Sequence, residues 1–146
     1  MDSLDNITEV LIMQHRSMQS CLDDIKTLIK ITDQEIELVN IKLKAFAKTL
    51  SVHVHLEENI FYPELLKQME NRSLDISKTV EFINRVREIR KVIEAFSDKY
   101  NCSEKIKNYL TDFDQELINV IEKLKIMIDS EEFGVFCYWK VLRGDI

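Results

Sequence analysis

Apolar residues recur along most of the chain at alternating intervals of three and four positions. In the first such segment, expected over residues 6–31, the recurring positions are Leu11, His15, Met18, Leu22, Ile25 and Ile29. An α-helix completes a turn in about 3.6 residues, so this spacing aligns these positions on one helical face. The pattern therefore predicts an amphipathic helix that buries this face.

Three further segments with this periodicity are expected over residues 34–71, 76–100 and 104–133, separated by short polar stretches. The buried face predicted for the second segment includes Phe46, Leu50, His53, Glu57 and Ile60. Pro63 also lies inside this segment. It should kink the helix, because proline removes a backbone hydrogen bond.

Four amphipathic helices with short connections predict an all-α, up-down-up-down antiparallel four-helix bundle. We expect a single domain over residues 1–146, in which an apolar tail, VFCYWKVL, follows the last helix. The 146 residues include only two glycines and one proline, which agrees with long helices and disfavours turn-rich β folds.

Charge and composition narrow the classes of function. The net charge of −6 disfavours binding to nucleic acid, which needs a basic surface. No apolar run approaches the roughly 20 residues that span a bilayer, and the acidic start MDSLDNITEV lacks a signal-peptide core, so we expect a cytoplasmic protein without a membrane partner. Cys21, Cys102 and Cys137 are widely spaced, which predicts free thiols and leaves open a redox role for one of them.

Ionisable residues interrupt the apolar faces at a few positions. The candidate metal ligands are His15, His53, Glu57 and Glu131. An ionised glutamate is rarely buried unless it is paired or bound to a metal, and we expect no lysine or arginine at the same depth on these faces. His53 and Glu57 are four residues apart, so both side chains can reach one cation. We expect His55, Glu58 and Glu132 to point outward.

Two imidazoles and two carboxylates suit Fe(II), Mn(II) or Zn(II), and iron is favoured where coordination positions remain open. The four candidate ligands therefore predict a metal centre inside the bundle. From the residues alone, iron is the first choice, and manganese or zinc remains possible.

Several stretches together resemble the hemerythrin-like, or HHE cation-binding, family. They are LIMQHRSMQ, HVHLEENIFYP, VREIRKVIEAF and MIDSEEFGVF. The resemblance implies a four-helix bundle with two irons, each held by histidines from two helices and bridged by carboxylates. It assigns ligand roles to His15, His53, Glu57 and Glu131. Val86 and Met127 stand where the third and fourth helices of the family carry histidines, which implies one ion in preference to two.

The expected function is therefore a mononuclear, non-haem iron protein that senses or regulates oxygen, redox state or metal, with oxygen or another diatomic molecule as its ligand. An enzymatic role is disfavoured, because no separate acid or nucleophile is evident. A second possibility is a di-iron site with non-histidine ligands from Glu81, Glu88 or Asp129.

A third possibility is a metal-free bundle that acts through protein contacts. The apolar residues of the tail are Phe136, Tyr138, Trp139, Val141 and Leu142. They predict either a cap on the open end of the bundle or a surface for a homodimer or another protein.

Overall fold

The computed structural model describes residues 4–29 and 35–144, and within these ranges the secondary structure is helical, without strands. The helical elements are α1 (Ile7–Ile29), α2 (Ile36–Leu56), the π-helix η2 (Glu57–Phe61), α3 (Tyr62–Asn71), α4 (Ser77–Lys99), α5 (Ser103–Asn108), α6 (Leu110–Phe133) and α7 (Val135–Leu142). The predicted all-α class is confirmed for the described part of the chain. None of the described helices combines the length and apolar character needed to cross a lipid bilayer.

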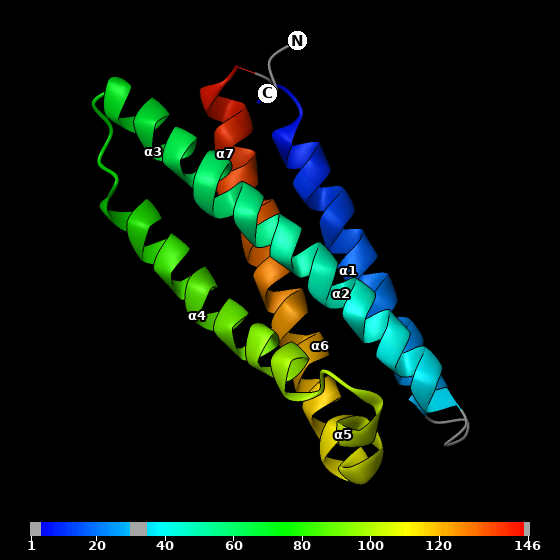
Figure 1. The fold of residues 1–146 in the computed structure, drawn as a ribbon. Coiled ribbons are helices and arrows are strands. Elements are labelled where there is room, and N and C mark those ends of the chain that lie inside the picture. The colour runs from blue at the N-terminus through cyan, green and yellow to red at the C-terminus, as the bar shows by residue number, and fades with distance from the viewer. Residues whose placement is uncertain (1–3, 30–34, 145–146) are drawn as a thin grey trace.

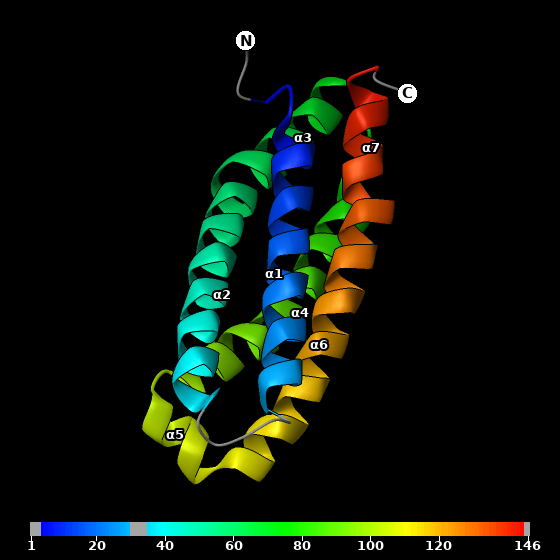
Figure 2. The same ribbon diagram turned by 90° about the vertical axis from the view of Figure 1, so that its right-hand side faces the viewer.

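The long helices α1, α2, α4 and α6 form one bundle, and the chain direction alternates from each of them to the next (Figures 1 and 2). Helix α1 contacts α2 and α6, and α4 contacts α6. The short helix α5 lies at one end of the bundle, and α3 and α7 lie at the other, near the start of α1 (Figure 2). The segment predicted as one helix over 104–133 is divided at Tyr109 into α5 and α6.

The second long segment runs through α2, η2 and α3 without a break, and its π-helical turn ends two residues before Pro63. A π turn contains one residue more than an α turn, so it moves the following residues round the helix axis. Ile60, which we expected to be buried, is 37% exposed, whereas Phe61 and Tyr62 are buried. The π-helical turn thus changes which residues of this segment face the core.

The described residues form two apolar clusters in the interior. One is formed by residues that include Met18, Leu50 and Met127. The other lies at the α7 end and includes Leu11, Phe61 and Trp139. Along α1, the α2–η2 segment and α6–α7, buried polar residues lie between the parts that belong to the two clusters. A polar layer therefore separates two hydrophobic cores.

Helix α7 closes one end of the bundle with aromatic side chains. Phe136 stacks on His15 with ring centroids 5.5 Å apart, and Phe61 lies edge-on to Phe136 and Trp139. Phe136 and Trp139 are almost fully buried. The apolar tail thus caps the bundle, and α7 completes the second apolar cluster.

Candidate metal centre

The candidate ligands come together in the polar layer, and all of their side chains are fully buried. His15 Nε2 lies 3.0 Å from Glu131 Oε1. His53 Nε2 lies 3.3 Å from Glu57 Oε1 and 3.7 Å from Glu131 Oε1. The bundle therefore brings His15, His53 and Glu131 from α1, α2 and α6 together in one buried layer, and Glu57 of η2 adjoins them, as the spacing in the sequence predicts.

These separations fit a shared metal ion. Two atoms bound about 2.1 Å from one ion are about 3.0 Å apart at a right angle and about 3.4 Å apart at the tetrahedral angle. The ligand atoms of His15, His53 and Glu131 all lie within 4.8 Å of one another. Glu57 adjoins this group through its contact with His53. The centre therefore offers a mixed nitrogen and oxygen donor set of a size suited to a first-row divalent metal.

Both histidine rings are oriented by hydrogen bonds to their outer nitrogens. His15 Nδ1 lies 2.7 Å from Glu132 Oε2, and His53 Nδ1 lies 2.8 Å from Gln14 Oε1. Because both partners offer oxygen acceptors, each Nδ1 carries the hydrogen. Each Nε2 then turns toward the centre, which is how an outer hydrogen bond fixes the tautomer of a metal-binding histidine.

Two buried atoms at the centre have no hydrogen-bond partner among the described residues. They are His53 Nε2 and Glu57 Oε1. Buried polar atoms in proteins are normally paired, since an unpaired one costs about 1–3 kcal/mol. A cation within reach of both atoms removes that cost, so the donors present here fit a bound metal.

Tyr62 connects the two buried carboxylates. Its hydroxyl lies 3.0 Å from Glu131 Oε2 and 3.3 Å from Glu57 Oε2, and it can donate to either. Burial raises the pKa of Tyr62 far above its ordinary value, so the hydroxyl keeps its proton and remains a donor. The hydrogen bonds engage the Oε2 atoms, whereas the Oε1 atoms face the histidines.

Two glutamates expected to point outward are in fact paired. The side chains of Glu58 and Glu132 are 25% and 14% exposed. Glu132 accepts hydrogen bonds from Arg16 as well as from His15. Burial would raise the pKa of Glu132, but hydrogen bonds from Arg16 and His15 outweigh it and hold the pKa below its usual range. Both residues thus face away from the centre as expected, but they are partly buried and paired where we expected them to be solvated, whereas His55 is exposed as expected.

The expectation that no basic residue reaches the depth of the centre was wrong. Arg90 on α4 is only 8% exposed, and its Nη1 lies 4.0 Å from Glu57 Oε1. The spacing of Ile83, Val86, Arg90 and Ile93 places the arginine on the buried face of α4, and this spacing was the signal in the sequence that could have found it. A positive charge therefore lies beside the centre.

The positions at which ligands for a second ion were expected do not supply them to the centre. Val86 and Met127 are buried within the first apolar cluster. Glu81, Glu88 and Asp129 are exposed on the surface. The structure thus does not bring the three candidate acidic residues to the buried centre.

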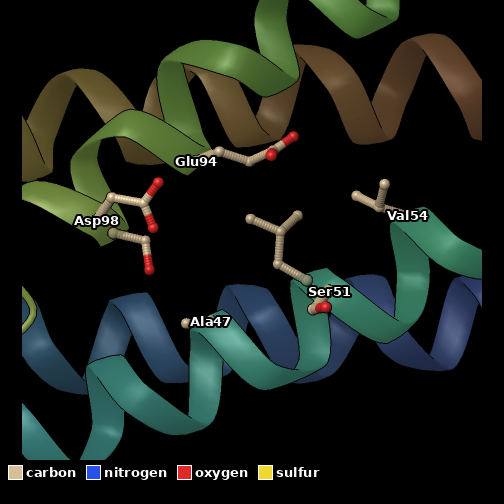
Figure 3. Close-up of a pocket in the computed structure, with 7 residues that line it drawn as sticks. Ala47, Ser51, Val54, Glu94 and Asp98 are labelled. Carbon is tan, nitrogen blue, oxygen red and sulfur yellow. The ribbon is translucent and has the colours of Figure 1, made fainter.

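A pocket with a volume of about 240 Å³ lies between α2 and α4 (Figure 3). Glu94 and Asp98 of α4 face Ala47 and Ser51 of α2 across it. None of its lining residues is a candidate ligand. Glu94 also accepts a hydrogen bond from Arg90 Nε, so the arginine links this pocket to the centre.

Comparison with known families gives one match. Residues 2–65 match the family described as hemerythrin HHE cation binding domain. This stretch contains His15, His53, Glu57 and Tyr62, whereas Arg90 and Glu131 lie beyond it. No curated protein and no solved structure shows a significant match to the chain.

Proposed function

We propose that this chain binds a single metal ion at its buried centre, because residues 2–65 match the hemerythrin HHE cation binding domain family. The proposed ligands are His15, His53, Glu57 and Glu131. The observation that carries the proposal is the pair formed by His53 Nε2 and Glu57 Oε1. These two buried acceptor atoms lie 3.3 Å apart, and neither has a hydrogen-bond partner among the described residues.

The contact between His15 and Glu131 supports the same proposal. With its hydrogen on Nδ1, a neutral His15 ring directs the lone pair of Nε2 toward Glu131 Oε1 at 3.0 Å. Two acceptor atoms at this distance repel each other unless a cation lies within reach of both. A divalent ion satisfies both contacts and offsets the two buried carboxylates.

We infer iron as the preferred ion, with manganese or zinc as alternatives, because the donor set combines imidazoles and carboxylates. Iron(II) at such a site supplies one electron and an exchangeable coordination position. This chemistry suits the sensing of oxygen or another diatomic molecule. The protein orients both imidazoles, provides the Tyr62 hydroxyl as a donor, and limits the access of water with apolar layers above and below.

The direct test is the metal content of protein produced in media supplemented with iron, manganese or zinc. We expect close to one ion per chain, and loss of that ion in His53→Ala. The matched control is His55→Ala, which removes an exposed histidine two residues away and should retain the metal. A metal content near zero for all three metals, or an unchanged content in His53→Ala, contradicts the proposal.

A second candidate, a metal-free interaction module, is favoured by one feature of the same centre. A doubly protonated His15 would donate to both Glu131 and Glu132, and Arg90 lies beside Glu57, so charges could balance without a metal. The exposed apolar side chains of Phe133 and Val141 would then offer a contact surface. Light scattering with gel filtration, on wild type and on Phe133→Ser with Val141→Ser, tests this candidate. An oligomer that the double variant dissociates supports it, whereas a monomer in both contradicts self-association through this surface.

A further inference from the structure

The chain places a positive charge of its own beside the candidate metal centre. The Arg90 guanidinium is held on two sides, with Nη2 2.9 Å from Glu58 Oε1 and Nε 3.2 Å from Glu94 Oε1. These bonds direct the remaining nitrogen, Nη1, toward Glu57. Nη1 is buried and has no hydrogen-bond partner within the described part of the chain. The guanidinium is thus anchored by acidic residues outside the centre and faces one inside it.

Glu57 Oε1 lies between two groups of different character. His53 Nε2 is 3.3 Å away, and Arg90 Nη1 is 4.0 Å away. The first is a candidate metal ligand, whereas the second is a permanent cation, because a guanidinium does not lose its proton in proteins. One buried carboxylate oxygen therefore faces a candidate metal ligand and a fixed charge.

We propose that Arg90 is a permanent second cation of the centre. It neutralises Glu57 when no metal is bound, and it opposes the binding of a further ion beside Glu57, which keeps the count at one. This inference rests on the proposed metal site. Its physical basis is that charges within a few ångströms interact strongly in a buried environment, so the guanidinium attracts Glu57 and repels a divalent ion.

The proposal predicts that loss of the Arg90 charge lowers the stability of the metal-free protein but raises its affinity for metal. Without metal, Arg90→Gln leaves Glu57 buried without its cation, which should lower the Tm by on the order of 10 °C. With metal, the same substitution removes a repulsive charge, so the affinity for Zn²⁺ should rise by about tenfold or more. If Arg90 had only a structural role, Arg90→Gln would lower both the Tm and the affinity for Zn²⁺, because a loosened site binds metal less well.

Controls separate the charge of Arg90 from its hydrogen bonds. Arg90→Lys keeps the charge, so the metal-free Tm and the affinity for Zn²⁺ should both stay close to those of wild type. Arg87→Gln is the matched control, because Arg87 also lies on α4 and bonds Glu58, at 2.7 Å and 2.8 Å, whereas within the described part of the chain no hydrogen bond or ion pair joins it to Glu57. We expect Arg87→Gln to leave Zn²⁺ affinity nearly unchanged.

The measurements are thermal unfolding of the metal-free protein and Zn²⁺ titration in competition with a chelator. The proposal is overturned if Arg90→Gln weakens Zn²⁺ binding, or if its metal-free Tm equals that of wild type. Should Arg90→Gln fail to fold, adding Glu57→Gln should restore folding, and a double variant that stays unfolded also overturns it. If wild type binds no Zn²⁺, the proposed metal site fails. In that case the other half of the proposal can still be tested. If Arg90→Gln lowers the Tm and Arg87→Gln does not, the result supports the neutralisation of Glu57 by Arg90.

Discussion

Glu132 accepts a hydrogen bond from His15 Nδ1 at 2.7 Å, and this contact directs the other ring nitrogen of His15 toward Glu131. Glu132 therefore orients a candidate ligand without facing the centre itself. Loss of such outer partners typically costs about 10–100-fold in metal affinity. We expect Glu132→Gln to weaken metal binding to this extent, as measured by competition with a chelator. Arg16→Gln is the control, because it removes the other partner of Glu132 and keeps the contact with His15.

The Tyr62 hydroxyl is expected to stabilise the metal-free protein. Tyr62→Phe removes the donor that lies within reach of both Glu57 and Glu131, and leaves their Oε2 atoms unpaired in the interior. The free energy of unfolding should fall by about 1–3 kcal/mol, measured by urea denaturation. Tyr109→Phe alters an exposed tyrosine and should have little effect. Equal losses in the two variants would argue against a role for the hydroxyl bonds.

The ion pairs of Glu58 make a definite contribution to the pH dependence of stability. Hydrogen bonds from Arg87, followed by those from Arg90, hold the pKa of Glu58 below its ordinary value of 4.5. Its contribution is therefore complete above about pH 4.5 and is lost as the pH falls through the lower pKa of the folded state. Glu58→Gln should be less stable than wild type at neutral pH. The difference should shrink on acidification, which urea denaturation at a series of pH values will measure. A difference that is constant with pH would show that the charge of Glu58 contributes nothing.

A second metal site is expected only when both ligands and charge are changed. Val86→His with Met127→His introduces two imidazoles at buried positions. With Arg90 present, the metal content should remain near one ion per chain, because the guanidinium opposes another dication. Adding Arg90→Gln should raise it toward two, as measured by elemental analysis. If the content does not rise in the triple variant, these two positions do not correspond to the missing ligands.

The ligand positions were predictable because helical periodicity extends through them. His15, His53, Glu57 and Glu131 occupy the same spacing as their apolar neighbours, so the pattern alone places them on buried faces. The all-α fold class was predicted from the same helical periodicity. Local spacing is enough to predict a helix and its buried face, because nearby residues determine which positions share one helical face.

Other features depend on contacts that local spacing does not contain. Tyr62 lies five positions after Glu57, which is off the face of a regular α-helix, and only the π turn brings both residues inward. The partners of Glu132 are more than a hundred residues away along the chain. Arg90 had the correct spacing, but arginines usually lie on the surface, so its burial depends on acidic partners from other segments.

The position of the polar layer between two apolar clusters has a consequence for cooperativity. Each cluster is a hydrophobic unit that can open separately when the layer between them is weakly held. An ion bound by α1, α2, η2 and α6 would link these elements at the boundary, so that the α7 end opens only together with the rest. Metal occupancy would then decide whether the bundle unfolds as one unit or as two. The bound metal would thereby control local opening of the bundle near α7.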